Sequence, residues 1–405
     1  MFQFERKLFL RSKKTLIAIL ILLVITLASS FIAGYHNREA KSKVILHDEL
    51  MVQNIENMLQ DLEEQYQNSL IDQMDYEAEQ KFFTDYIANY QKEIQAVKND
   101  DWAYFYESNI QHYQLDGQYI SFAYEGYGFT SQTIENTVLV SKYLLEHEIP
   151  SAFPTELFLT AFELPKSQTD REIVNSLGQQ ALKGASHEIW KWQKNSGVII
   201  TSLLFLVCFT DFFIKNQIGN NRQIRLLQTS GMSRIQITCK KYIAFFILYS
   251  FLFFATYLCH FLISSLVNGN SSWIYPIPTY ISKELTFSFI HTHISPIYQV
   301  IFLASCIHYL YLLFLLGVAQ TIAILFKNGL AGFLVTLGMA LCANLYPNIF
   351  NPFSLWNAGD LSDGSILIFH QFSGDVTTRA LFILLISNLL IYILQFYLLI
   401  RKREV

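Results

Sequence analysis

Ionisable side chains lie inside apolar runs of this 405-residue chain, where an unpaired charge is costly. Asp211 lies near the end of one run, four residues before Lys215, and His260 and His308 lie within two others. This spacing is about one helical turn, so we predict that Asp211 pairs with Lys215 or with a neighbouring helix. The alternative roles for Asp211 are the transmission of motion and a proton or ion site. The single histidines are predicted to be hydrogen-bonded packing residues, with proton transfer as the alternative.

Signatures of nucleotide binding and of the common hydrolases are absent from the sequence. It contains no G-x-x-x-x-G-K-[ST] phosphate-binding loop, no H-E-x-x-H, no C-x-x-C and no G-x-S-x-G. We therefore predict no catalytic, cofactor-binding or metal-binding residues and no enzymatic activity. Any nucleotide chemistry is expected to belong to another chain.

Long apolar runs dominate the composition, since 52% of the residues are hydrophobic and only 15% are charged. A helix needs about 20 apolar residues to cross a hydrocarbon core of roughly 30 Å, because lipid offers no partner for unpaired backbone groups. Six runs meet this length: 15–35, 197–214, 242–267, 300–326, 330–345 and 380–400. The sequence therefore predicts an all-α membrane protein with about six transmembrane helices. The first run is longer than a signal-peptide core, so it is expected to be a retained anchor.

Charge is divided unevenly between the segments that connect these runs. The two ends of the chain, residues 215–241 and Lys327 together carry 15 Lys and Arg, whereas residues 36–195 carry 12 Lys and Arg against 26 Asp and Glu. Positive residues mark the cytoplasmic side of a membrane protein. Both termini are thus predicted to be cytoplasmic, and residues 36–195 to form an acidic extracellular domain.

The same charge distribution argues against nucleic acid as a partner. All five cysteines lie outside residues 36–195, so no disulfide framework is possible in that domain. The absence of disulfides there favours a bacterial plasma membrane.

The predicted order of segments follows from these spans. Residues 1–14 form a cytoplasmic interfacial helix, 15–35 the first span, 36–195 the extracellular helical domain, 197–214 the second span and 215–241 a cytoplasmic loop. The third span (242–267) leads to an extracellular loop (268–299). The fourth and fifth spans (300–326 and 330–345) lead to another (346–379), and the sixth (380–400) to a cytoplasmic tail (401–405). In the second extracellular loop, Asp360, Asp363 and Asp375 are expected in solvated turns.

The extracellular domain begins with two amphipathic patterns. Apolar residues recur every three or four positions from Leu46 to Tyr66 and again from Leu70 to Val97, which predicts an antiparallel pair of helices. The aromatic stretch from Trp102 to Phe129 is predicted to supply core and a membrane-facing belt, or alternatively a surface for an amphiphilic ligand. A last helix is expected to end at Trp190 and Trp192, at the outer interface of the second span.

The loop between the second and third spans combines basic and apolar residues. Its apolar members are Ile224, Leu226 and Leu227, its basic members include Arg222, Arg225 and Arg234, and Gly231 permits a turn before Ser233. This pattern predicts a short helix, a turn and the start of a second helix. An ordinary basic loop lying on anionic membrane lipid is the alternative.

These loop residues resemble a pattern of type 2 ABC exporter permeases, I-K-L-L-x-x-x-P-x-S-R followed by a lysine. The matching residues are Ile224, Arg225, Leu226, Leu227, Ser233, Arg234 and Lys240 or Lys241, with Gly231 in place of the common proline. The basic segment from Phe2 to Lys14 and the stretch from Tyr346 to Gly364 also resemble that family. The resemblance implies a coupling helix that docks on a separate cytoplasmic ABC ATPase, which binds the ATP. It also implies a dimer with a second copy or a related permease.

Two other interpretations stay open. Arg222, Ile224, Leu227 and Gly231 also resemble the R-x-I-x-x-L-x-x-x-G pattern of MacB-like and FtsX-like mechanotransmission subunits, although the predicted six spans favour the type 2 family over these four-span proteins. A membrane sensor with an extracellular ligand-binding domain is the third interpretation. If the chain is an exporter, its acidic and aromatic domain favours an amphiphilic or cationic cargo such as a peptide, an antibiotic or a lipid.

Overall fold

The computed structural model describes residues 9, 12–115, 118–119, 130–150, 158, 168, 184–195, 197–214, 233–282, 290–367 and 374–401. The chain divides into two compact units. The first, here called the bundle, comprises residues 1–31, 185–269 and 279–405, and the second unit comprises residues 32–184 and 270–278. The structure is mostly helical.

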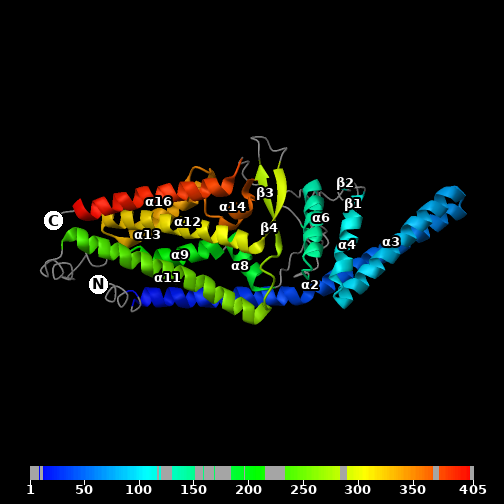
Figure 1. The fold of residues 1–405 in the computed structure, drawn as a ribbon, viewed down its shortest axis with the longest axis horizontal. Helices are drawn as coiled ribbons and strands as arrows, with labels where there is room; N and C mark the ends of the chain where they lie inside the picture. The colour runs from blue at the N-terminus through cyan, green and yellow to red at the C-terminus, as the bar shows by residue number, and fades with distance from the viewer. Residues whose placement is uncertain are drawn as a thin grey trace. The chain divides into compact units, whose positions relative to one another are not determined.

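Among the described residues, six helical segments lie side by side along the bundle (Figure 1). They are the first part of α2 (Lys13–Gln67), α8 (Ala185–Lys194) with α9 (Gly197–Phe209), α11 (Arg234–Asn268), α12 (Ile297–Phe326), α13 (Gly329–Leu345) and α16 (Val376–Arg401). A 3-10 turn η1 (Pro352–Ser354) and the short helix α14 (Ala358–Asp363) lie between α13 and α16.

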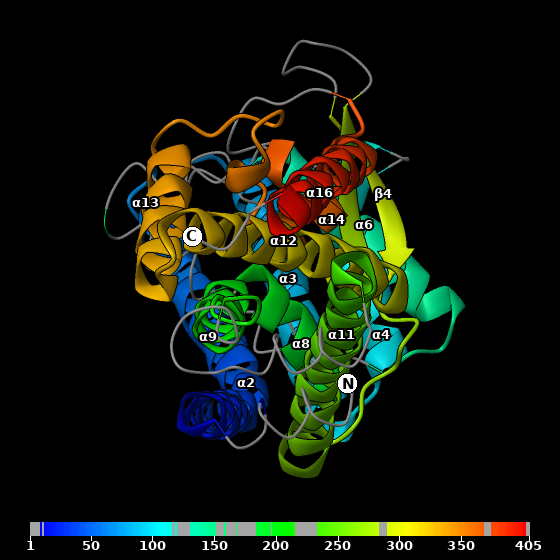
Figure 2. The same ribbon diagram turned by 90° about the vertical axis from the view of Figure 1, so that its left-hand side faces the viewer.

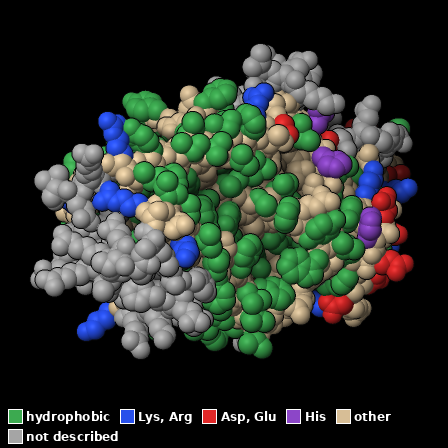
Figure 3. All heavy atoms as spheres, turned by 60° about the vertical axis from the view of Figure 1, so that its left-hand side comes forward, with side chains coloured by type: hydrophobic (Ala, Val, Ile, Leu, Met, Phe, Trp, Pro, Cys, Tyr) green, Lys and Arg blue, Asp and Glu red, His purple; other side chains and the backbone are tan. Residues whose placement is uncertain are grey.

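Several of these helices mark the chain as a multi-pass membrane protein. Among the described residues, four are long and apolar enough to cross a membrane: Lys13–Tyr35 of α2, and the whole of α11, α12 and α16. A fifth candidate combines α8 and α9, which meet at a bend of 73°, and α13 is apolar but shorter. Hydrophobic side chains cover the middle of the molecular face in Figure 3, which suits contact with lipid.

Helix α12 is the centre of the bundle. It is packed among α8, α9, α13 and α16 (Figure 2), and 67% of its most apolar window is buried, against 28% or less in α2, α11 and α16. An apolar helix that is buried over most of its surface has little need of an amphipathic pattern. The other helices expose the face that α12 does not cover.

Hydrogen bonds between side chains and neighbouring helices establish the direction of each helix. Three bonds join α12 and α16 in the same order along both, and the helices are therefore parallel: Leu310 with Asn388, Leu313 with Tyr392, and Gln320 with Gln395. The segment α8–α9 also runs parallel to α12, because Gln193 contacts Ser305 and Phe209 contacts Gln320.

The remaining helices run the opposite way. Helix α13 folds back on α12, so that Gly332 lies against Ala319 and Ala323. Ser30 of α2 contacts Ser264 near the end of α11, whereas Lys14 contacts Asp211 just beyond α9. Successive described helices of the bundle therefore alternate in direction.

This alternation brings one set of chain segments to the same end of the bundle (Figure 1). The start of α2 with Lys14, the start of α11 after Ser233, the α12–α13 turn at Lys327 and the end of α16 at Arg401 all lie there. We call it the basic end, defined by Lys14, Ser233, Lys327 and Arg401.

The prediction of an all-α chain is wrong in detail, because four strands accompany the helices in the described part of the chain. Strands β3 (Pro276–Ser282) and β4 (Ile290–Pro296) form one two-stranded sheet, and β1 (Gln114–Leu115) and β2 (Gln118–Tyr119) form an antiparallel second one. Residues 276–282 and 290–296 are rich in Thr and Ile, and β-branched side chains favour extended backbone. The strands lie within segments that were predicted as loops or as part of the helical domain.

Two helices extend well beyond the predicted spans. Helix α11 begins at Arg234, eight residues before the predicted start of the third span, because Ser233 caps it. Helix α2 is continuous from Lys13 to Gln67, so the first span and the first amphipathic helix are one element. Its sequence contains no proline that would interrupt it.

In the second unit, the predicted antiparallel pair is present. The end of α3 (Gln73–Asn99) pairs with the middle of α2 through Lys98 and Glu49, 3.6 Å apart. The start of α3 meets the end of α2, where the rings of Tyr66 and Tyr76 stack with centroids 4.4 Å apart. Lys41 also pairs with Asp100 at 2.8 Å.

The predicted aromatic core of this unit is found in part. Helix α4 (Trp102–Tyr113) packs against α6 (Ser131–Glu146) and buries Phe105, Tyr106 and Tyr113. Residues 120–129, the rest of the aromatic stretch, lie outside the described residues. Burial raises the pKa of the Glu93 carboxyl on α3, although Ser108 donates a hydrogen bond to it.

The contact between α12 and α13 yields a prediction. A Cβ atom at Gly332 would lie 2.3 Å from the carbonyl oxygen of Ala319, so Gly332→Leu is expected to destabilise the purified protein by about 1–3 kcal/mol, the usual cost of overpacking. Gly338→Leu on the same helix is the matched control, because nothing lies within 4 Å of the Cβ position there. Thermal melting in detergent would compare them, and equal melting temperatures for the two variants would contradict the described packing.

Candidate functional site

At the basic end, Asp211 is paired with a lysine of a neighbouring helix. Its Oδ2 atom lies 3.1 Å from Nζ of Lys14 on α2, and Gly329 at the start of α13 lies against the same carboxylate. The side chains are 67% and 33% exposed for Lys14 and Asp211, so the pair contributes only about 0–1 kcal/mol. Lys215, the other predicted partner of Asp211, lies outside the described residues.

Most of the predicted coupling residues also lie outside the described residues: Arg222, Ile224, Arg225, Leu226, Leu227 and Gly231. Ser233 and Arg234 are described. Ser233 Oγ accepts a hydrogen bond from the Gln236 backbone N–H at 3.2 Å, and Gln236 Oε1 accepts one from the Ser233 N–H at 3.1 Å. This capping box fixes the start of α11 at Arg234, so the predicted second helix of the loop is the first turn of α11 itself.

Three polar side chains join four helices inside the bundle near the basic end. Gln320 on α12 donates a hydrogen bond to the Phe209 carbonyl at 3.1 Å and accepts one from Gln395 on α16 at 3.1 Å. Gln395 in turn accepts a hydrogen bond from the hydroxyl of Tyr242 on α11 at 2.8 Å. We call Gln320, Gln395 and Tyr242 the glutamine network. Sequence reasoning missed it, although two isolated glutamines in apolar runs are a signal of such bonding.

A second polar group lies further along the bundle, between α8, α11 and α12. Gln193 Nε2 donates to Ser305 Oγ at 2.8 Å and to the hydroxyl of Tyr257 at 3.4 Å. That hydroxyl lies 2.6 Å from Nδ1 of His308, so His308 is the hydrogen-bonded packing residue that was predicted. His260 packs its ring against Trp192, with centroids 4.9 Å apart, but neither of its ring nitrogens has a hydrogen-bond partner among the described residues, so the prediction of a hydrogen bond is wrong there. Trp190 and Trp192 are buried within the bundle, and their place at the outer interface of the second span stays a prediction.

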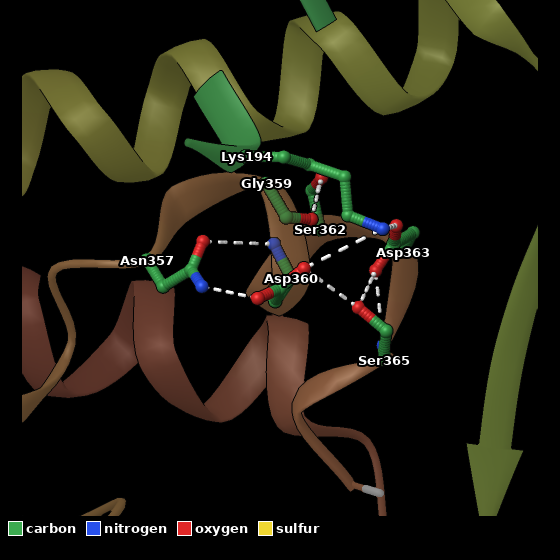
Figure 4. Close-up of polar contacts among 7 residues, drawn as sticks. All are labelled: Lys194, Asn357, Gly359, Asp360, Ser362, Asp363 and Ser365. Atoms are coloured by element: carbon green, nitrogen blue, oxygen red, sulfur yellow. Dashed lines mark hydrogen bonds and ion pairs between the residues drawn. The ribbon is translucent and has the colours of Figure 1, made fainter. Parts of the chain in front are cut away.

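Three charged side chains meet at the bend between α8 and α9 (Figure 4). Nζ of Lys194, the last residue of α8, lies 2.7 Å from Oδ2 of Asp363 and 3.4 Å from Oδ1 of Asp360. The Asp363 side chain is 1% exposed, that of Asp360 13% and that of Lys194 25%. The ammonium also lies 4.9 Å from the ring centroid of Trp190. Both carboxylates therefore share one partly buried cation.

Short polar residues of the α14 segment hold the two carboxylates in place (Figure 4). Ser365 Oγ donates to Asp363 at 2.7 Å and to Asp360 at 2.9 Å, and the Ser365 N–H also donates to Asp363 at 2.9 Å. Asn357 donates to the other oxygen of Asp360 and accepts from its backbone N–H at 3.3 Å. We call Lys194, Asp360, Asp363 and Ser365 the Lys194 cluster.

Burial and the Lys194 ammonium act in opposite directions on the pKa of one carboxyl of this cluster. Burial raises the pKa of the Asp360 carboxyl, and the nearby Lys194 ammonium offsets part of that rise. Gly359 allows the α14 backbone to approach the end of α8, because a Cβ atom there would lie 2.5 Å from Cγ and 2.8 Å from the backbone nitrogen of Lys194. The contact is thus both ionic and steric.

The prediction of solvated turns is wrong for Asp360 and Asp363, since Asp363 is buried and Asp360 is mostly buried against Lys194. It suits Asp375, which is exposed and accepts a hydrogen bond from the Thr378 N–H at 3.0 Å at the start of α16. Local spacing indicates turns in all three cases. Only the approach of α8, remote in sequence, distinguishes the buried pair from the exposed residue.

Neither a cluster of metal ligands nor a disulfide is found in the parts of the chain that the structure describes. No group of three or more His, Cys, Asp or Glu side chains there is placed to hold a metal ion. All five cysteines are free thiols.

Comparison with known proteins adds no family. No protein-family model, no curated protein and no solved structure matches the chain.

The polar group around Gln193 yields a prediction. Tyr257→Phe is expected to lower stability by about 0.5–1.5 kcal/mol, because it removes a hydroxyl that contacts both Gln193 and His308. Tyr298→Phe is the control, since that hydroxyl is on a 45% exposed residue at the start of α12. Thermal melting in detergent would compare them, and an unchanged melting temperature for Tyr257→Phe would show that the hydroxyl does not contribute.

Proposed function

We propose that this chain is the membrane-embedded permease subunit of an exporter that is driven by a separate cytoplasmic ABC ATPase. In this proposal α2, α8–α9, α11, α12, α13 and α16 cross the cell membrane six times. Both termini and the loop before α11 are cytoplasmic, and the acidic second unit is extracellular. The chain itself binds no nucleotide.

The observation that carries the proposal is the gathering of chain segments at the basic end. Lys14, Ser233, Lys327 and Arg401 belong to segments that lie at one end of alternating helices, as the distribution of positive charge requires for six spans. The loop with the permease-like pattern joins α9 to the capped start of α11 at this same end.

Two of the six proposed spans, α9 and α13, are shorter than the hydrocarbon core of a membrane. Helix α9 has 13 residues and α13 has 17, which correspond to roughly 20 and 25 Å, less than a hydrocarbon core of roughly 30 Å. Residues of the bent α8 extend α9, and local thinning of the bilayer or tilted packing accommodates α13.

The glutamine network provides a route for force in this proposal. The loop is attached directly to α11 and follows α9 closely, and both helices are tied to Gln320 and Gln395 on α12 and α16. A push on the loop by an ATPase would therefore move four helices together, because packed elements shift as units between discrete arrangements.

The partners follow from the same proposal. Two ATPase subunits bind the cytoplasmic face, and a second permease copy or a related permease completes the export path, with membrane lipid around the apolar faces. An amphiphilic or cationic peptide, antibiotic or lipid is the proposed cargo, because the extracellular domain is acidic and rich in aromatic residues.

A MacB-like or FtsX-like mechanotransmission subunit is the second candidate. It is favoured by α2, which continues without interruption from the first apolar stretch into the amphipathic helix of the second unit. An unbroken helix transmits movement along its length without passing a cargo through the membrane. Such a subunit would have four spans.

Charge reversal in the loop tests the coupling. The double substitution Leu227→Asp with Arg234→Asp is expected to abolish the vanadate-sensitive ATP hydrolysis that purifies with the tagged chain, because it removes an apolar contact and reverses a charge. Gln228→Asp, which lies in the same loop outside the pattern, is the control and should keep the activity. Retained hydrolysis in the double variant would refute the coupling role, and no hydrolysis with the unmodified chain would favour a sensor.

Cysteine labelling tests the six-span topology. Single cysteines are placed at Asp72, Lys327, Asn348 and Arg401 in a chain whose native cysteines are replaced. In intact cells, a membrane-impermeant maleimide is expected to label positions 72 and 348, and only a permeant one positions 327 and 401. Labelling of position 327 from outside, or protection of position 348, would contradict six spans and favour the four-span candidate.

A further inference from the structure

The Lys194 cluster lies at a junction of the chain that the proposed function leaves without a role. Lys194 ends α8, which follows the second unit directly, and the 73° bend separates it from α9, which leads to the cytoplasmic loop. Asp360 and Asp363 lie on α14, between α13 and α16. The cluster therefore ties two separate stretches of the bundle at its end remote from the basic end.

This contact is stiffer than a single surface ion pair. Two carboxylates and one ammonium are largely buried, and Ser365 and Asn357 fix the carboxylates from the α14 side. Removing one partner would leave a buried charge without compensation. The α14 backbone at Gly359 also lies against the backbone of Lys194, so the bend has little room to open while the cluster is intact.

Stability alone does not require an ionic contact here. Neutral side chains of similar size often replace a buried ion group without loss of stability, whereas a charged group with fixed hydrogen bonds demands one geometry. A charge cluster at a bend between rigid helices thus favours a positioning role over a purely stabilising one.

We infer that Lys194 is a positioning residue, which through Asp360 and Asp363 locks the α8–α9 bend to α14 so that the two move as one body. The inference rests on the proposed function, in which movement starts at the cytoplasmic loop. The Lys194 cluster would pass that movement on between helices at the extracellular end of the bundle. Movement of α9 is then passed to α14 and α16, and movement of α8 is passed to the same helices.

The decisive experiment measures, in the full chain, the separation of the α8–α9 bend from the start of α16, which Thr377 ties to α14 by a hydrogen bond to the Leu361 carbonyl. Nitroxide labels at Asn195→Cys and Asp375→Cys, both exposed positions, are introduced into a chain without native cysteines and reconstituted in lipid nanodiscs. Electron spin resonance should give a single narrow distance distribution for the unmodified cluster. The triple variant Lys194→Met, Asp360→Asn, Asp363→Asn should lose it and give a broad or shifted distribution.

Melting temperatures and distance distributions of three cluster variants distinguish a positioning role of the cluster from a purely stabilising one. Lys194→Met alone should lower the melting temperature, because two buried carboxylates lose their cation, and the triple variant should recover most of that loss. Lys194→Arg, which keeps the charge, should retain the narrow distribution. If the folded triple variant keeps the narrow distribution, the cluster is only structural and the inference is overturned.

A second readout connects the cluster to the proposed function. With the ATPase bound, the distance between the labels is expected to be the same before and after vanadate trapping in the unmodified chain, and to differ between these states in the triple variant. A distance that changes on trapping in the unmodified chain would overturn the inference. If no ATPase purifies with the chain, the proposed function fails, while the nanodisc measurement still decides whether the lock exists.

Discussion

Hydrogen bonding without water is the constraint on which this structure depends. Helices long enough to cross a membrane expose apolar faces to lipid, so a polar side chain among them must find its partner on its own helix, as Thr201 and Thr321 do, or on another helix. Helix α12 supplies partners on all sides, and Gln320 alone contacts α9 and α16. Each such bond is possible in only one register, and the polar side chains therefore fix the alignment of helices whose apolar surfaces would allow several.

The same constraint operates more strongly on charge. At the basic end, Lys14 and Asp211 are partly exposed, and their pairing contributes little. Where charges are buried, as at Lys194 and Asp363, the surrounding hydroxyl and amide groups complete their hydrogen bonding. The bundle thus has a loosely held charge pair near the loop proposed to bind an ATPase and a tightly held cluster at its other end. In the proposed exporter, the weak Lys14–Asp211 pair suits a region that moves when the ATPase binds. The Lys194 cluster suits a contact between helices that keeps its geometry during that movement.

Apolar length predicted most helices of the bundle well, because it reflects a requirement that each segment meets alone. The predicted spans 300–326 and 330–345 correspond to α12 and α13 within a few residues. Local signals failed where elements merge or bend: α2 and α11 are longer than their apolar cores, and α8 bends away from α9. The strands β3 and β4 were not predicted, because a seven-residue pattern without regular alternation is a weak local signal and the pairing of the two strands stabilises them.

The sequence by itself determined that the chain is helical and multi-pass, and that its positive and negative segments are separated, because hydropathy and charge are properties of each segment alone. It also indicated the polar residues that would need partners, such as Asp211 and His308. Only the tertiary structure decided which residues are those partners and which helix is central. It also decided that Asp363 is buried while Asp375 is not. Such pairings join residues that are remote along the chain, and they follow from how whole helices pack rather than from any local pattern.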